Sequence, residues 1–286
     1  MLRERLHNLF RLGQYAEILS NAETWFQQHG AEPALALWVA TYACRAAAAE
    51  RQWGVAVKWA EQAAALKVRD AEAEGYVQLS LGVAQMYLGN AFRAEKALAA
   101  FDRLASRSAK VRQLQPFADF NRAILMRFMR RHGEEVECLR RAAEGFAARN
   151  RLRDNLHCRL EIAWAHLLQS QPQLAQPELE EAARWLDAVG DDELQVDFRI
   201  SWALCHKLTG DLEAAERLCQ EVLQRDTLEP RQEAEALWIL GCVAQARGDL
   251  ALARQYGDTA YRIATQDYWP MQVERIEALR SVALAN

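Results

Sequence analysis

Residues 202–215 read WALCHKLTGDLEAA, and the same pattern returns as LGCVAQARGDLALA at residues 240–253. An earlier copy, LGVAQMYLGNAFRA, occupies residues 81–94. Each copy joins one amphipathic helical stretch to another through a Gly-Asp or Gly-Asn turn. Glycine accepts the left-handed backbone conformation that ends a helix, and Asp or Asn caps the helix that follows. The pattern therefore predicts a helical hairpin.

The turn residue of this pattern defines a register that extends through the chain at a nearly constant interval. The seven anchors are Gly13, Arg51, Gly89, Gly133, Pro172, Gly210 and Gly248. Successive anchors are mostly 38 or 39 residues apart, with one step of 44. Small residues recur seven positions before an anchor, among them Gly82 and Gly241, and a glycine inside a helix predicts close packing there. We therefore predict about seven antiparallel helical hairpins.

The composition also favours an all-α chain. The 286 residues are 51% hydrophobic, and only 13 are Gly and 6 are Pro. Val, Ile and Thr are scarce, which leaves few residues that favour strands. A formal net charge of −4 argues against a broadly basic nucleic-acid binder. Residues 1–30 fit the first hairpin, so no separate DNA-reading module is left, and we predict no direct nucleic-acid partner.

The order Leu-Gly, then Gly-Asp seven residues later, then Ala five residues beyond, resembles the tetratricopeptide repeat. The resemblance covers nearly the whole chain. Helices of this length also resemble the repeat domains of the maltose-regulon type of bacterial activators and of related peptide-sensing regulators. The resemblance implies an all-α, right-handed superhelix of about seven antiparallel hairpins. It also implies a protein that binds proteins, peptides or small effectors and is not an enzyme.

We divide the chain into a repeat domain, residues 1–267, and a C-terminal helix, residues 268–286. Apolar residues recur at helical spacing in this last stretch: Trp269, Val273, Ile276, Leu279 and Val282. Stacked repeats need capped ends, so the favoured interpretation is a capping helix. The alternative interpretation is a docking face for a further domain.

By the resemblance, the first helix of each hairpin lines a concave wall, with exposed positions 13, 6 and 3 residues before each anchor. The peptide- or protein-binding residues selected from these positions are Arg45, Tyr76, Phe120, Arg127, Arg130, Arg159 and His166. The later hairpins contribute Asp197, Leu204, Lys207, Glu235, Cys242 and Gln245. Guanidinium groups pair with carboxylates and aromatic faces hold apolar side chains, so this mixture predicts an extended partner with acidic groups. We expect a charge reversal such as Arg127→Glu to weaken binding without unfolding the protein.

The charge distribution agrees with an acidic partner. Residues 103–159 hold 14 Lys or Arg and 6 Asp or Glu, a net charge of +8. Charge asymmetry of this size steers a partner of the opposite sign. The alternative interpretation is that these arginines only solvate the outer faces of the helices.

Candidate catalytic and metal-binding patterns have plainer interpretations. The acidic run at residues 191–193 is expected to offset the positive end of a helix dipole. His157 and Glu161, followed by His166, lack the spacing of a zinc-binding helix and are expected to be structural. The six cysteines form no C-x-x-C pair and indicate buried thiols in a reducing cytoplasm. We therefore predict no enzyme activity, no catalytic or metal-binding residues, no cofactor, no membrane span and a cytoplasmic location.

Two functions of different kinds follow from these patterns. The leading hypothesis is a non-catalytic scaffold that binds a peptide or protein segment in its concave groove. The alternative is an effector- or peptide-sensing regulator whose superhelix changes shape when the ligand binds. An all-helical enzyme is a third interpretation, and it would require a deep pocket with paired carboxylates or a bound metal. The sequence leaves the ligand and the oligomeric state open.

Overall fold

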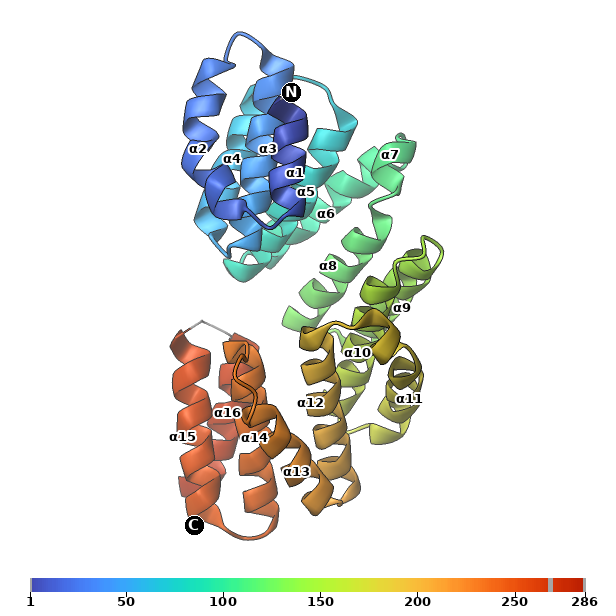
Figure 1. Cartoon of the computed structure of the whole chain (residues 1–286), viewed down its shortest axis with the longest axis vertical. Coiled ribbons are helices and arrows are strands. Elements are labelled where there is room, and N and C mark those ends of the chain that lie inside the picture. Colours follow the sequence, from blue (N-terminus) through green and yellow to red (C-terminus); the bar gives the residue numbers. More distant parts are fainter. Residues whose placement is uncertain (1, 267–269, 285–286) are drawn as a thin grey trace. The chain divides into compact units, whose positions relative to one another are not determined.

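Helices make up the chain in a computed structural model that describes residues 2–266 and 270–284 (Figure 1). The described residues contain sixteen helices and no strand, so the predicted all-α class is confirmed. The chain divides into two units, Met1–Gly145 and Phe146–Asn286, and the division falls inside α9 (His132–Ala147).

Within residues 2–266, fourteen helices form seven hairpins, in each of which a first helix is followed by a second. The first helices are α1 (Leu2–Arg11), α3 (Pro33–Ala49), α5 (Ala71–Tyr87), α8 (Gln115–Phe128), α10 (Leu152–Leu168), α12 (Asp192–Thr209) and α14 (Pro230–Ala246). The second helices are α2 (Tyr15–Gln28), α4 (Trp53–Ala65), α6 (Ala91–Ala105), α9, α11 (Pro172–Val189), α13 (Leu212–Leu223) and α15 (Leu250–Gln266). The short α7 (Ala109–Arg112) and the last helix, α16 (Pro270–Leu284), do not belong to a hairpin.

One backbone hydrogen bond recurs in all seven hairpin turns and defines the register of the repeat. In each turn a residue with positive φ follows the first helix. The next residue donates its N–H to the carbonyl group five residues earlier, at 2.8–3.0 Å. The positive-φ residues are Gly13, Arg51, Gly89, Arg130, Ser170, Gly210 and Gly248. The predicted seven-hairpin repeat is therefore confirmed within these residues.

Two of the seven predicted anchors were wrong. The turns lie at Arg130 and Ser170, whereas the sequence pattern indicated Gly133 and Pro172. Gly133 lies in the first turn of α9, and Pro172 opens α11, where its fixed φ and missing N–H suit the first helical position. The corrected steps are 38, 38, 41, 40, 40 and 38 residues, and α7 lies within the longest of them.

Replacing Ser170 by glycine is expected to stabilise the protein by about 0.5–1 kcal/mol. Ser170 is exposed and has a φ of 56°, and this left-handed conformation strains a residue that carries a Cβ atom. Glycine removes the strain, although its larger freedom in the unfolded chain cancels part of the gain. Calorimetry should show a higher midpoint temperature for Ser170→Gly and no increase for Ser170→Ala, which keeps the Cβ atom. A glycine variant that melts with the wild type would contradict this account of the turn.

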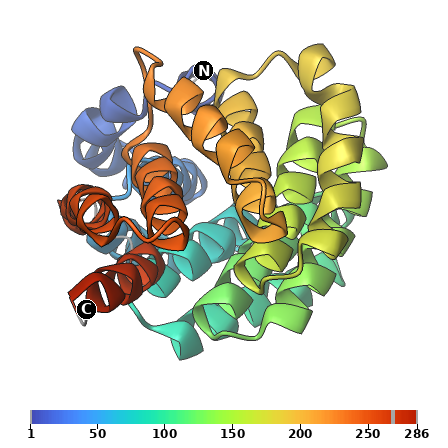
Figure 2. The same cartoon turned by 90° about the horizontal axis from the view of Figure 1, so that it is seen from below.

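Two glycines inside first helices permit close helix packing, as their positions predicted. A Cβ atom at Gly82 would lie 3.3 Å from the Leu98 side chain on α6. A Cβ atom at Gly241 would lie 2.6 Å from Leu279 on α16 and 3.3 Å from the carbonyl oxygen of Ala253 on α15. A Cβ atom at either position would be a tight contact that requires the neighbouring leucine to shift. At Gly241 the close approach involves α15 and α16, which pack against α14 and against each other (Figure 2).

The last helix buries its apolar face on the last hairpin. Ile276 of α16 is 2% exposed and belongs to a cluster with Leu237 of α14 and Ala260 of α15. The capping role predicted for this helix remains a prediction. The boundary expected between residues 267 and 268, together with Trp269, lies outside the described residues.

Candidate functional site

The first helices of the first unit share a face on which aromatic rings surround one guanidinium group. Arg45 on α3 has its Cζ atom 4.0 Å from the ring centroid of Phe10 on α1 and 4.0 Å from that of Tyr76 on α5. The Tyr42 ring, on the same helix as Arg45, is 5.1 Å away. Arg45 and Tyr76, both selected from the sequence, therefore meet in one cluster. We call Arg45 with Phe10, Tyr42 and Tyr76 the Arg45 cage.

The Arg45 cage holds a cation without an acidic partner. Among the described residues, no Asp or Glu lies within ion-pair distance of Arg45. Burial lowers the pKa of Arg45, and the neighbouring phenol groups of Tyr76 and Tyr42 offset only part of this effect. Burial also raises the pKa of Tyr42, whose hydroxyl oxygen lies 3.1 Å from His7 Nδ1. A partly buried charge without a counter-ion is unfavourable, and a bound anion would relieve this cost.

A second arginine of the same face has the acidic partner that Arg45 lacks. Arg3 on α1 has its Cζ atom 3.7 Å from the ring centroid of Trp38 on α3, and it pairs with Glu72 on α5 at 3.2 Å. The Trp38 indole N–H donates to Asp70 Oδ2 at 3.1 Å, and Asp70 caps the N-terminus of α5. These contacts join α1, α3 and α5 across the face, whereas Arg45 has no carboxylate partner among the residues that the structure describes.

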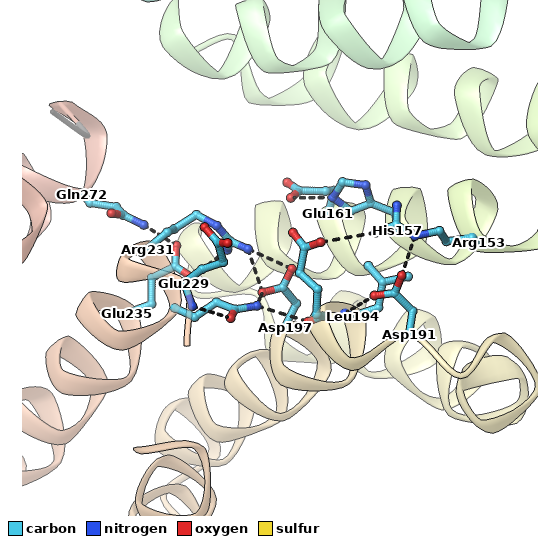
Figure 3. A network of polar contacts seen from close by, with 12 residues as sticks. Arg153, His157, Glu161, Asp191, Leu194, Asp197, Glu229, Arg231, Glu235 and Gln272 are labelled. Atoms are coloured by element: carbon cyan, nitrogen blue, oxygen red, sulfur yellow. Dashed lines mark hydrogen bonds and ion pairs between the residues drawn. The ribbon is translucent and has the colours of Figure 1, made fainter. Parts of the chain in front are cut away.

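The first helices of the second unit carry a row of polar side chains that extends to α16 (Figure 3). Arg231 on α14 donates to both carboxylate oxygens of Asp197 on α12, at 2.8 and 2.9 Å, and to Glu235 at 3.1 Å. Gln272 on α16 donates to the other oxygen of Glu235 at 2.7 Å. Gln232 donates to Asp197 at 2.8 Å. We call these five residues the Arg231 network.

The Arg231 network is largely buried, and one guanidinium is shared by its two carboxylates. Its two carboxylates and two amides are each at most 8% exposed. Burial raises the pKa of Glu235 by more than Arg231 and Arg275 lower it. Burial alone would lower the pKa of Arg231, but the carboxylates of Glu235 and Asp197 outweigh burial and raise that pKa. Loss of one partner would leave a buried charge uncompensated, so the network holds α12, α14 and α16 together.

The row continues to α10 through an exposed ion pair. Arg153 donates to Asp191 at 2.5 Å, and Asp191 accepts the N–H of Leu194 at 3.0 Å as the N-cap of α12. Burial would raise the pKa of Asp191, but the Leu194 N–H and Arg153 outweigh burial and lower it. The acidic run at residues 191–193 thus opens a helix, as the sequence indicated.

Two indole rings hold an arginine of the last helix. The Cζ atom of Arg275 on α16 lies 5.1 Å from the ring centroid of Trp238 on α14 and 5.5 Å from that of Trp164 on α10. Arg275 also lies 3.9 Å from Glu235 of the Arg231 network. Cation–π contacts of this kind add to the attachment of α16 to the first helices.

The other five predicted binding residues all derive from the two misplaced anchors. Arg127 donates through Nε to Glu135 at 2.5 Å, and His132 Nδ1 lies 3.1 Å from the second oxygen of Glu135. The side chains of Arg127 and Glu135 are 11% and 1% exposed. Phe120 is half-buried on α8, and Arg130 is the exposed turn residue with a φ of 58°. Arg127 therefore belongs to a buried ion pair, which reverses the expectation that Arg127→Glu leaves the fold intact.

The two predicted residues of α10 contact neighbouring parts of their own hairpin. Arg159 donates to Glu178 on α11 at 2.8 Å. His166 is 8% exposed, and its Nδ1 atom lies 3.2 Å from Gln171 Oε1 in the hairpin turn. Both side chains have partners within the hairpin, and neither belongs to the polar row of Figure 3.

The corrected turns identify residues that the sequence reasoning missed. Counting 13 residues back from Ser170 gives His157, which lies on the polar row. Counting 3 residues back from Gly13 gives Phe10 of the Arg45 cage. Arg231 lies four residues before Glu235, which is the first position that the spacing rule selects in its hairpin. The spacing rule therefore does not identify Arg231. The spacing rule brings Arg45 and Tyr76 into one cluster, and the corrected anchors move its other positions. The binding role of all of these residues remains a prediction.

The described residues offer no metal site. In residues 2–266 and 270–284, no group of three or more His, Cys, Asp or Glu side chains is placed to hold a metal ion. His157 lies 3.6 Å from Glu161, in an ion-pair arrangement. The cysteines are free thiols, and burial raises the pKa of Cys44 and Cys219 to about 12 and that of Cys242 to about 11. Such thiols are poor nucleophiles at neutral pH.

In the described part of the chain, no helix combines the length and the apolar character that crossing a bilayer requires.

Solved structures with this fold are known, although no protein-family model and no curated protein matches the sequence. NprR in complex with its cognate peptide NprX has a TM-score of 0.66 at 14% identity, over 95% of this chain and 82% of that one. The apo form of RapI has a TM-score of 0.64 at 12% identity, and the match covers 99% of this chain and 80% of RapI. A third match is a signal-transduction ATPase from Pyrococcus horikoshii that has a tetratricopeptide repeat sensor. Its TM-score is 0.66 at 14% identity, and the match covers 98% of this chain and 44% of that protein. The fold is therefore the tetratricopeptide-like helical repeat.

Proposed function

We propose that this chain is a non-catalytic helical-repeat scaffold that binds a peptide or protein segment on the first-helix face of its first unit. In this proposal an acidic group of the ligand binds Arg45. The observation that carries the proposal is the Arg45 cage, a partly buried guanidinium with aromatic neighbours and no acidic partner among the described residues. The structure of NprR with the peptide NprX supports a peptide as the ligand class for this fold.

The chemistry of the cage suits a carboxylate. Phe10 and Tyr76 each contact the Arg45 guanidinium at 4.0 Å, and these contacts restrict its motion before a ligand arrives. A preorganised side chain loses less conformational entropy on binding. The N–H donors of a guanidinium lie at its edge in a fork that matches the two oxygens of a carboxylate. The flanking rings offer apolar surface to the neighbouring side chains of the ligand.

The Arg45→Met variant is expected to lose at least about tenfold in affinity for acidic peptides, because a hydrogen bond to a charged group contributes about 1.5–3 kcal/mol. Methionine keeps the apolar contact with the rings and removes an unpaired charge, so the midpoint temperature of unfolding should stay equal or rise. An array of short acidic, neutral and basic peptides identifies the tightest acidic probe. Titration calorimetry with that probe then measures the affinity of each variant.

A matched control distinguishes binding at the Arg45 cage from attraction to the general positive charge of the surface. Arg11 is exposed at the end of α1. The Arg11→Met variant loses the same charge and should bind the acidic probe with wild-type affinity. Arg45→Lys keeps the charge without the fork and should bind with intermediate affinity. Wild-type protein without a preference for acidic peptides, or an Arg45→Met variant with unchanged affinity, would contradict the proposal.

A peptide-sensing regulator is the second candidate function. The tetratricopeptide repeat sensor from Pyrococcus horikoshii has the same fold, which favours this candidate. Small-angle scattering distinguishes it from a rigid scaffold: a sensor should change its radius of gyration when the acidic probe binds, and a scaffold should not. The cytoplasmic location and the lack of catalysis remain predictions.

A further inference from the structure

We infer that the first unit holds a second ligand site, separate from the Arg45 cage, for a zwitterionic α-amino acid with an apolar side chain. The site is a cleft of about 380 Å³ between α6, α8 and α9. Its lining includes three buried apolar side chains, Leu98, Leu125 and Met126, each at most 5% exposed. Binding sites for small molecules combine such an apolar lining with a few polar groups, and this volume is within their usual range.

Two side chains of the cleft retain hydrogen-bonding capacity. Arg141 on α9 is 50% exposed, and the nearest Asp119 oxygen lies 3.7 Å from its Nε atom, which is too long for a hydrogen bond. Arg141 also donates to Cys138 Sγ at 3.0 Å, and a thiol is a weak acceptor. Glu137 has no ion-pair or hydrogen-bond partner among the residues that the structure describes. The cleft therefore offers one cation and one anion to a ligand.

The other arginines of the cleft are already neutralised by close carboxylates. Arg122 donates to Asp102 at 2.7 Å and to Asp119 at 2.9 Å. Arg131 donates to Glu134 through two hydrogen bonds, at 2.5 and 2.7 Å. A ligand gains little from ions that are already paired, so Arg141 and Glu137 determine which charges the ligand must carry.

The spacing of this pair selects an α-amino acid. Glu137 and Arg141 lie four residues apart on α9, which places their Cβ atoms about 6 Å apart on one face of the helix. An α-amino acid carries its ammonium and carboxylate groups on a single carbon atom, so one small molecule can reach both side chains. Its own side chain then contacts the apolar lining. A ligand with only one charged group would leave either Glu137 or Arg141 unpaired.

Thermal unfolding and titration calorimetry of the full chain test this site with four probes. The probes are L-leucine, L-methionine, N-acetyl-L-leucine and L-leucinamide. At a tenfold excess over its dissociation constant, a zwitterionic probe should raise the midpoint temperature by about 2–4 °C. The acetylated probe lacks the ammonium group and the amide lacks the carboxylate, so each should bind at least about tenfold more weakly.

Three variants locate the binding in the cleft. Arg141→Gln removes the cation and Ala99→Phe fills the rim of the cleft, and each should abolish the response to L-leucine. Arg140→Gln changes the neighbouring exposed arginine, outside the cleft lining, and should respond as the wild type does. No shift with either zwitterion, or an undiminished response in both Arg141→Gln and Ala99→Phe, would overturn the inference. Acidic peptides should bind all three variants normally, so this inference and the peptide proposal can fail separately.

Discussion

Replacing Arg231 by methionine is expected to lower the free energy of unfolding by roughly 3–5 kcal/mol, the range found when one partner of a buried ion pair is removed. Arg231 is the shared partner of two carboxylates, Asp197 and Glu235, which are 8% and 5% exposed. Methionine fills much of the same volume but donates no hydrogen bond. Asp197 would lose both of its bonds to the guanidinium, and Glu235 would retain the amide of Gln272 and the more distant Arg275 at 3.9 Å.

A surface ion pair on the same unit provides the control for this substitution. Arg225 pairs with Asp192 at 3.3 Å, and the Asp192 side chain is 86% exposed. Arg225→Met removes the same charge but should change the free energy of unfolding by less than about 1 kcal/mol, because exposed pairs contribute little. Urea unfolding of the two variants measures both values. A loss below about 1 kcal/mol in Arg231→Met would show that the network does not hold the first helices together.

The difference in the free energy of unfolding between the wild type and Arg231→Met should become smaller as the pH falls below neutral. Burial raises the pKa of Glu235 in the wild type, and loss of the Arg231 charge raises it further. A carboxyl group with a higher pKa in the folded state than in the unfolded state binds its proton more readily when folded. Its penalty is therefore present at neutral pH and disappears as the pH falls through the folded-state pKa. A deficit that grows on acidification would contradict this assignment.

The hairpin turns illustrate how far sequence reasoning reaches for the fold. Gly89, Gly210 and Gly248 are recognisable because glycine adopts positive φ without strain, and Arg51 follows from the spacing between glycine turns. Arg130 and Ser170 adopt the same conformation, but neither residue type signals it. The sequence around them offers a nearby glycine and a nearby proline instead, and these lie in the first turns of α9 and α11. A rule based on local residue types cannot tell a glycine or proline in the hairpin turn from one in the first turn of the following helix.

The candidate site was predictable only where the register was right. Arg45 and Tyr76 meet because the turns at Arg51 and Gly89 were placed correctly. Asp197 was also assigned to an inner position, yet its partner Arg231 lies 34 residues away on another hairpin. The reach of an arginine between hairpins depends on how the helices pack, which the repeat pattern does not encode. That no described Asp or Glu pairs with Arg45 is likewise a property of three helices together.

Reversing the charge of Arg127 is expected to destabilise the protein by roughly 3–5 kcal/mol, although the sequence suggested a surface role for this residue. Glu135 is 1% exposed in its side chain, and Arg127 donates to it directly. Arg127→Glu would place a second carboxylate beside a buried one, and His132, 3.1 Å from Glu135, is too exposed to replace the lost guanidinium charge fully. Arg140→Glu makes the same charge change on the exposed side of α9 and should cost no more than about 0.5 kcal/mol for each like-charged neighbour.

A double substitution decides whether the loss in Arg127→Glu comes from the buried charge or from altered packing. Arg127→Met combined with Glu135→Met removes both charges and keeps apolar volume at the interface between α8 and α9. Replacing a buried ion pair by apolar residues of similar size is often neutral or stabilising, so the double variant should recover most of the lost stability. If it melts as early as Arg127→Glu, the pair acts through its geometry, and the electrostatic account of Arg127 fails. Recovery would identify Arg127 as the counter-ion that a buried carboxylate requires, which is a reason for an arginine at this position that needs no ligand.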